Sequence, residues 1–194
     1  MATPNKFITM VVSTAERGIP EEVYAGWRET ESPYAESGHK SEEDFQTFLG
    51  KMGVEILKED PDPQKVRELV AEGRIAFRRS TATEDFESGT DGYFFNPLTG
   101  KMVPEDMTIS TDPDVHTEKR EREREGGPRF LPLNKRELEL AARGSQRDQD
   151  KVWRSVNVLL LRDALDQSRS GKVRIPEAKL AGIERKLAEL QYQT

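Results

Sequence analysis

The stretch Gly92-Tyr-Phe-Phe-Asn-Pro-Leu-Thr-Gly-Lys-Met-Val103 carries the clearest fold signal in the chain. Two short apolar runs flank Asn96-Pro-Leu-Thr-Gly100, and Asn, Pro and Gly are the residues that turns favour. The pattern predicts a β-hairpin with a five-residue loop over residues 96–100. We expect its aromatic side chains to pack in the core, because large aromatic residues in such runs are usually buried.

Further strands and helices are predicted before this hairpin. Lys6–Val12 and Arg74–Arg79 are rich in apolar or alternating residues, which indicates strands. A helix is expected from Ser41, a good capping residue, and a second one from Pro63. Residues 1–112 are therefore expected to form a small mixed α+β region with short strands and the hairpin.

A charged segment and a helical module are predicted to follow. Residues 113–128 read as a connector, because Glu118–Glu125 contains only acids and bases and Gly126-Gly-Pro128 ends it. Residues 129–194 are expected to be helical, with helices starting near Asn134, Asp148 and Pro176. The last two helices should form an antiparallel pair, so the fold class predicted for the whole chain is α+β.

Composition limits the classes of function. The chain has 194 residues, of which 34% are hydrophobic and 34% charged, so its core should be thin and part of its surface covered by partners. It has no cysteine, which excludes thiol nucleophiles and thiolate metal sites. No signal peptide is recognisable, and the longest apolar block elsewhere, Val158–Leu161, is far too short to span a membrane. We expect a soluble protein of the cytoplasm, or of an assembly built from cytoplasmic protein, with no membrane partner.

The apolar faces of the last two helices are the candidate interface with other protein chains, including a second copy of this one. Leucine and isoleucine recur at three- and four-residue spacing in the final helix, a narrow seam suited to packing against another helix. The interface residues predicted are Trp153, Val156, Leu160, Leu180, Ile183, Leu187 and Leu190.

The loop between these helices, residues 166–177, resembles the calcium-binding loop of the EF-hand family over 12 residues. That family takes oxygen ligands at loop positions 1, 3, 5, 7 and 12 and a glycine at position 6, which is Gly171 here. Arg169, Lys172 and Arg174 place three positive charges in the loop, so a helical connection that bends at Gly171 is the favoured interpretation. The resemblance implies Asp166, Ser168, Ser170, Lys172 and Glu177 as calcium ligands.

A second candidate metal site is the triplet Asp112, Asp114 and His116. In an extended segment these alternating residues would project from one face, as metal ligands require. Asp-Pro pairs are also ordinary turn formers, and that interpretation is favoured. No catalytic triad or glycine-rich phosphate loop is present, and carboxylate pairs such as Glu42 and Glu43 recur too often to indicate acid–base catalysis.

Basic residues at helical spacing form a third candidate site. Residues 1–115 have a net charge of −11 and residues 116–194 a net charge of +5, so positive charge is concentrated in the second part. A basic helix face binds phosphates, although a solvated or partner-facing surface is the favoured interpretation in an acidic protein. The nucleic-acid residues predicted are Arg143, Arg147, Lys151 and Arg154.

The sequence therefore favours a non-enzymatic interaction or structural component of a larger assembly, such as an accessory subunit or a virion protein. Two alternatives stay open: a regulator that binds nucleic acid through the basic helix face, and a protein that binds a divalent cation through the loop at residues 166–177. Nothing in the sequence predicts a cofactor.

Overall fold

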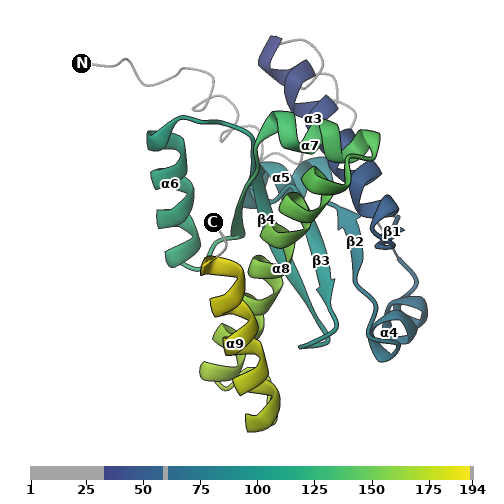
Figure 1. Cartoon of the computed structure of the whole chain (residues 1–194), viewed down its shortest axis with the longest axis vertical. Coiled ribbons are helices and arrows are strands. Elements are labelled where there is room, and N and C mark those ends of the chain that lie inside the picture. The colour runs from purple at the N-terminus through teal and green to yellow at the C-terminus, as the bar shows by residue number, and fades with distance from the viewer. Residues whose placement is uncertain (1–32, 59–60, 193–194) are drawn as a thin grey trace. The chain divides into compact units, whose positions relative to one another are not determined.

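The computed structural model describes residues 33–58 and 61–192. Residues 39–194 form one compact unit, which contains the whole sheet. The elements are α3 (Pro33–Lys51), β1 (Glu55–Leu57), α4 (Pro63–Ala71), β2 (Ala76–Arg79), α5 (Ala82–Ser88), β3 (Gly92–Asn96), β4 (Lys101–Thr108), α6 (Pro113–Arg124), β5 (Arg129–Pro132), α7 (Lys135–Arg143), α8 (Gln146–Arg169) and α9 (Glu177–Tyr192). The strands are arranged in the order β1-β2-β3-β4-β5 (Figure 1).

The predicted hairpin lies at the centre of this sheet. β3 and β4 pair antiparallel, with Phe94 opposite Val103 and Asn96 opposite Lys101. Gly100 closes the turn with a φ of 69°, in the left-handed region that glycine adopts without strain. The Asn96 side-chain oxygen accepts a hydrogen bond from the backbone N–H of Leu98 at 3.0 Å, the usual way in which Asn stabilises a turn.

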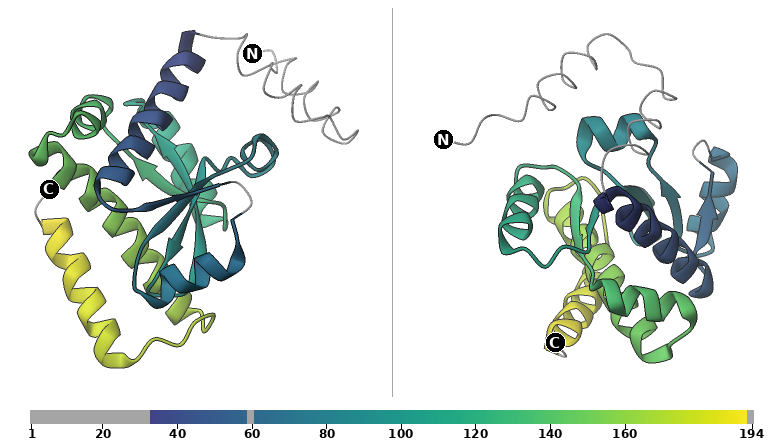
Figure 2. Two further views of the ribbon diagram at one scale, coloured as in Figure 1. Left: turned by 90° about the vertical axis from the view of Figure 1, so that its right-hand side faces the viewer. Right: turned by 90° about the horizontal axis from the view of Figure 1, so that it is seen from above.

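Parallel strand pairs flank the hairpin on both sides. β1 is parallel to β2, and β4 is parallel to β5, so helices α4 and α6 provide the crossover connections. One face of the sheet, with Phe77 and Phe94, packs against α3, α7 and α8; the other face packs Ala76 and Phe95 against α4 (Figure 2). The α+β class is confirmed, and the sheet is mixed.

The structure differs from the expected division at residues 113–128. Most of that segment is helix α6, and the residues after it begin with strand β5, which pairs with β4 although a helical module was predicted there. The main core cluster contains Phe45 from before the segment and Val156 from after it. The two predicted regions therefore share one sheet and one core. A four-residue strand that ends at Pro132 is too short to produce a periodic pattern.

The amino-terminal expectations are only partly covered. Helix α3 begins at Pro33, earlier than the Ser41 start that was predicted. The predicted strand Lys6–Val12 lies outside the described residues.

The predicted helix pair is present, since α9 runs back along α8 (Figures 1 and 2). The contact lies at the carboxyl-terminal half of α8, where Ala164 and Leu165 pack with Ile175 and Ile183. Trp153, nearer the start of α8, packs instead against Phe48 of α3, with their ring centroids 6.4 Å apart.

Candidate functional site

Acidic side chains from three parts of the chain gather at one end of the sheet. Glu42 lies on α3, Asp91 directly precedes β3, and Glu105 lies on β4. Strand pairing fixes two of them, because the backbone N–H of Asp91 donates to the carbonyl oxygen of Glu105 at 2.9 Å. Together these three side chains line a cavity of about 10 Å³, which we call the acidic pocket. A cavity of this size admits about one water molecule or one small ion.

Aromatic packing holds the walls of the acidic pocket. Phe77 and Phe45 line the pocket beside the acids, and their rings meet edge to face with centroids 5.8 Å apart. The Phe77 ring lies directly over Gly92, where a Cβ atom would stand 2.3 Å from the ring. Glycine at position 92, opposite Glu105 in the ladder, therefore leaves the space that this ring fills.

Some acids of this region have cationic partners. Glu42 forms an ion pair with Arg79 on β2. Asp106, beside Glu105 in sequence but on the opposite sheet face, pairs with Lys119 of α6. Its second oxygen lies 3.7 Å from the guanidinium of Arg122.

Asp91 and Glu105 form no ion pair with any residue that the structure describes. One carboxylate oxygen of Asp91 accepts the backbone N–H of Met107 at 2.7 Å. Glu105 is 1% exposed, and its buried Oε2 has no hydrogen-bond partner. A fully buried carboxylate, Glu105, and a half-buried one, Asp91, thus stand together without a paired cation, which is an unfavourable arrangement for the charged forms.

The pKa values express this electrostatic situation. Burial, followed by the negative charge of Asp106, raises the pKa of Asp91 to about 7. Burial, followed by the charges of Asp91 and Asp106, raises the pKa of Glu105 well above its usual range. Burial also raises the pKa of Asp106, although Lys119 acts in the opposite direction. The acidic pocket therefore retains protons at neutral pH or needs a bound cation.

Sequence patterns do not predict this site. Its acids are far apart along the chain, and Glu42 belongs to a carboxylate pair of a kind that is frequent in this sequence. One local signal is present: Glu105 and Asp106 stand side by side within a strand, and acidic residues are depleted from strands. An acidic residue inside a strand that lies between two other strands indicates either a functional role or a nearby cation that neutralises its charge.

The loop that resembles an EF-hand differs from an open calcium loop in two respects. Its first residues, Asp166 to Arg169, belong to the last turn of α8. The carboxylate of Asp166 forms an ion pair with Arg129 at 2.8 Å. Ser168, Ser170, Lys172 and Glu177 follow on the end of α8, the bend at Gly171 and the start of α9, so the favoured helical connection is the geometry present. Calcium binding stays a prediction.

The triplet Asp112, Asp114 and His116 does not form one extended face. Asp112 caps α6 by accepting the backbone N–H of Asp114 at 2.9 Å, and the other two residues lie on that helix. A ring nitrogen of His116 lies 2.6 Å from the carbonyl oxygen of Ser110. The expectation of an extended segment is corrected, because Asp followed by Pro starts a helix here. Among all described residues, no three His, Asp or Glu side chains are grouped closely enough to enclose a metal by themselves.

The predicted basic residues lie on the end of α7 and the first half of α8. Arg143 and Arg147 are exposed. Lys151 forms an ion pair with Glu137 of α7, so part of its charge is neutralised within the chain. Arg154 lines a groove beside β5. The four residues thus do not form one uniform unpaired stripe.

The predicted partner interface is largely internal. Val156, Leu160 and Ile183 are buried within the chain itself. Trp153, Leu180 and Leu187 are half-buried and pack against the core clusters, and Leu190 is half-buried in the groove beside β5. The residues are apolar because they form this chain's own core, which leaves only their partly exposed members for a partner.

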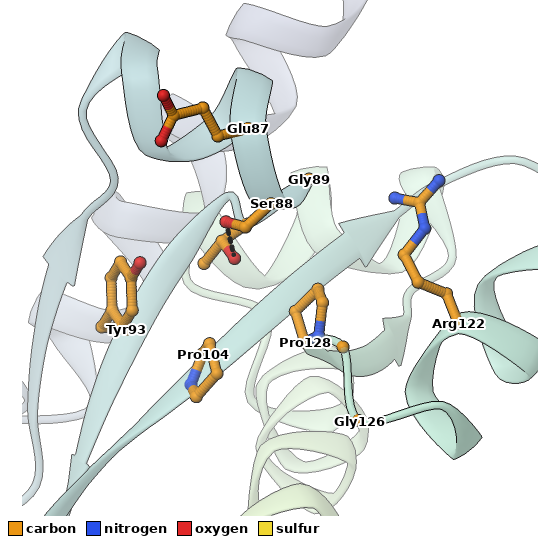
Figure 3. Close-up of a pocket in the computed structure, with 10 residues that line it drawn as sticks. Glu87, Ser88, Gly89, Tyr93, Pro104, Arg122, Gly126 and Pro128 are labelled. Carbon is orange, nitrogen blue, oxygen red and sulfur yellow. Dashed lines mark hydrogen bonds between the residues drawn. The ribbon is translucent and has the colours of Figure 1, made fainter.

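An open cavity of about 610 Å³ lies between α5 and the end of α6 (Figure 3). The absence of a side chain at Gly89 makes room for the guanidinium of Arg122, since a Cβ atom there would stand 2.3 Å from it. The hydroxyls of Ser88 and Thr90 are 2.7 Å apart and bond to each other, as the dashed line in Figure 3 shows. These two hydroxyls are thus already engaged, in contrast to the Oε2 atom of Glu105 in the acidic pocket.

No helix of the described part of the chain is both long and apolar enough to cross a membrane. Comparison with family models, with curated proteins and with solved structures finds no match to this chain.

Proposed function

We propose that the acidic pocket binds a divalent cation of the magnesium class and that the protein is a metal-dependent hydrolase of phosphate esters. The observation that carries this proposal is the Oε2 atom of Glu105, which is buried without a hydrogen-bond donor beside a second carboxylate and a cavity of about 10 Å³. Buried polar atoms in folded proteins are almost always satisfied, so such an atom calls for a partner.

The local charges match a divalent ion. Glu42 is paired with Arg79, and Asp106 with Lys119, which leaves Asp91 and Glu105 without a paired cation. When both of these acids are ionised they carry two negative charges, and their raised pKa values express the cost of that state without a cation. A cation of charge two balances these charges and makes the two unpaired carboxylates its ligands.

The ligand set favours magnesium over calcium. Calcium takes six to eight oxygens, whereas Mg²⁺ keeps several waters and is bound by one or two carboxylates together with substrate phosphates. Two carboxylates fit the second description, with the waters and the phosphate on the side of the Glu42–Arg79 ion pair, since the cavity itself admits about one ion. They also fit the finding that no three acidic or histidine side chains of the described residues enclose a site.

The substrate class follows from this ligand set and from the pocket entrance. A bound Mg²⁺ polarises a phosphoryl oxygen and lowers the pKa of a coordinated water. The side chains of Arg79 and Glu42 are 37% and 23% exposed, so the pocket reaches the surface at this ion pair. The Arg79 guanidinium is then placed to bind a phosphate oxygen, a contact for which arginine is well suited.

Cation binding is tested by calorimetric titration of the protein with Mg²⁺ and with Mn²⁺. We expect saturable binding by the wild type, its loss in the Glu105→Gln and Asp91→Asn variants, and normal binding by Glu43→Gln, which removes an exposed acid next to Glu42. Absence of binding by the wild type, or equal binding by all variants, would refute the cation site.

Hydrolysis is tested with the same proteins on bis(p-nitrophenyl) phosphate, single- and double-stranded DNA, and RNA. We expect turnover that requires Mg²⁺ or Mn²⁺, that disappears with chelator, and that Glu105→Gln abolishes while Glu43→Gln keeps it. If the wild type binds the cation but cleaves none of these substrates, the hydrolase part of the proposal is wrong and the cation site remains.

Nucleic acid is the phosphate ester with additional support in the chain. Arg143 and Arg147 are exposed and form no ion pair among the described residues, so they are available for a phosphate backbone. Their replacement by Ala is expected to weaken nucleic-acid binding and to reduce its salt dependence. If neither quantity changes, these arginines have no such role. The interaction or structural role favoured by the sequence also stays a proposal, and it is tested by identifying what co-purifies with the native protein.

A further inference from the structure

Strand β5 is the outer strand of the sheet and borders a groove. It pairs with β4 on one side and with no strand of the described residues on the other. All four of its residues line a groove of about 320 Å³ whose walls come from α6, α8 and the end of α9. An unpaired strand edge is a template for another strand, and natural proteins usually cover or block it.

The backbone of Phe130 faces this open edge. The backbone N–H of Leu133 donates to Thr108 of β4 at 2.8 Å, which fixes the side toward which the odd-numbered residues of this segment turn. Because successive residues of a strand direct their backbone groups to opposite sides, Phe130 presents its N–H and C=O away from β4. Its backbone has no other partner among the described residues. Phe130 therefore offers one donor and one acceptor to an added strand.

The groove is apolar at its base and basic at its rim. Leu131 and Leu159 are buried beneath it, and Val158 and Leu190 form half-buried walls. Arg120, Arg154 and Arg162 stand around it, and neither Arg120 nor Arg162 forms an ion pair with a described residue. The acid among the lining residues, Glu123, is bound to Arg129 at 3.3 Å.

We propose that this groove binds an acidic, extended segment of a partner protein as a sixth strand along β5. Backbone bonding to Phe130 supplies affinity, the apolar walls accept every second side chain, and the arginine rim selects acidic side chains between them. The proposal does not depend on the acidic pocket, since none of the groove residues lines that pocket.

The probe is a fluorescein-labelled heptapeptide of alternating Glu and Val, and binding is followed by fluorescence anisotropy. We expect saturable binding that weakens with added salt and that Arg162→Glu reduces roughly tenfold, because reversal of a rim charge replaces attraction by repulsion. Arg185→Glu is the matched control, since Arg185 is exposed on α9 and does not line the groove. The same peptide with Lys in place of Glu should not bind.

Hydrogen exchange distinguishes strand addition from simple charge attraction. Saturation with the acidic peptide should slow exchange of the Phe130 amide at least about tenfold, because that amide gains a hydrogen bond. Absence of binding, equal binding of the Lys peptide, equal loss in Arg185→Glu, or binding without protection of Phe130 would each overturn the proposal. So would light scattering that shows a dimer whose formation excludes the peptide, since the edge would then serve a second copy.

Discussion

Asp91→Asn is expected to make the protein more stable at neutral and alkaline pH, although it alters a half-buried polar group of the acidic pocket. The amide oxygen can still accept the backbone N–H of Met107, which lies 2.7 Å from the Asp91 carboxylate in the wild type. The substitution therefore removes the charge and keeps the hydrogen bond.

The magnitude follows from the pKa of Asp91, which is raised from 3.8 to about 7. At about 1.4 kcal/mol per pKa unit, ionisation of this group costs the folded state about 4 kcal/mol above pH 7. Asp91 is half-buried, and solvent screens the charge of a partly exposed carboxylate, so the full cost does not appear in the stability. We therefore expect a gain of about 2 kcal/mol in the free energy of unfolding, about half of the full cost.

The pH dependence has a defined sign. A carboxyl group whose pKa is raised by folding binds more protons in the folded state, so stability falls as pH rises from 3.8 towards about 7 and is then constant. Urea unfolding at a series of pH values, followed by circular dichroism, measures this. The gain of Asp91→Asn over wild type should be largest near pH 8 and should vanish near pH 4. A difference of at least about 1 kcal/mol between the gains at these two pH values is needed to support the prediction.

The same unfolding measurements in the presence of Mg²⁺ test the cation site. Excess Mg²⁺ should stabilise the wild type by mass action and leave Asp91→Asn unchanged. A variant that is less stable than the wild type at pH 8, or that keeps the full pH dependence, would refute the assignment of Asp91 as an acid whose charge destabilises the folded state. Such a result would also remove the charge argument for the cation.

Two further substitutions test the packing of the sheet. Gly92→Ala should lower the free energy of unfolding by about 1–3 kcal/mol, because its Cβ atom would stand 2.3 Å from the Phe77 ring. Gly50→Ala is the control: its Cβ atom meets no atom within 4 Å, so the variant should be neutral or stabilising. Urea midpoints compare the two variants, and equal effects would contradict the reasoning. Asn96→Ala should cost about 2–3 kcal/mol, because Asn96 is 0% exposed and the variant removes two hydrogen bonds of its side chain: the amide donates to the carbonyl oxygen of Leu160 at 2.9 Å, and the side-chain oxygen accepts the backbone N–H of Leu98 at 3.0 Å. A loss below about 0.5 kcal/mol in the same assay would show that water replaces these bonds.

Local patterns predicted those elements whose determinants are close together in the sequence. The hairpin at residues 92–103 follows from apolar runs around Asn, Pro and Gly, and the helix starting after Asn134 follows from a cap that the structure contains, with the Asn134 side chain accepting the Glu137 N–H at 3.1 Å. Strand β5 was missed because its pairing with β4 is decided across the intervening helix α6. Sequence periodicity carries no information about such a contact.

The acidic pocket was missed for a related reason, and the reason bears on how such sites are found. Composition does not distinguish the acids of this chain, since most of them are solvated and their ionisation does not destabilise the folded state. Among the acids of the described residues, Asp91 and Glu105 are distinguished by a raised pKa without an ion pair, and this environment arises only when β2, β3, β4 and α3 meet around Phe77. The predicted interface residues show the converse case. Val156 and Leu160 were expected to contact a partner, but both are buried in this chain's own core. An apolar residue is uninformative until the fold leaves it exposed, and an acidic residue is uninformative until the fold buries it. In this chain the informative residues are therefore Glu105, buried without a partner, and Phe130, whose backbone the sheet leaves unpaired.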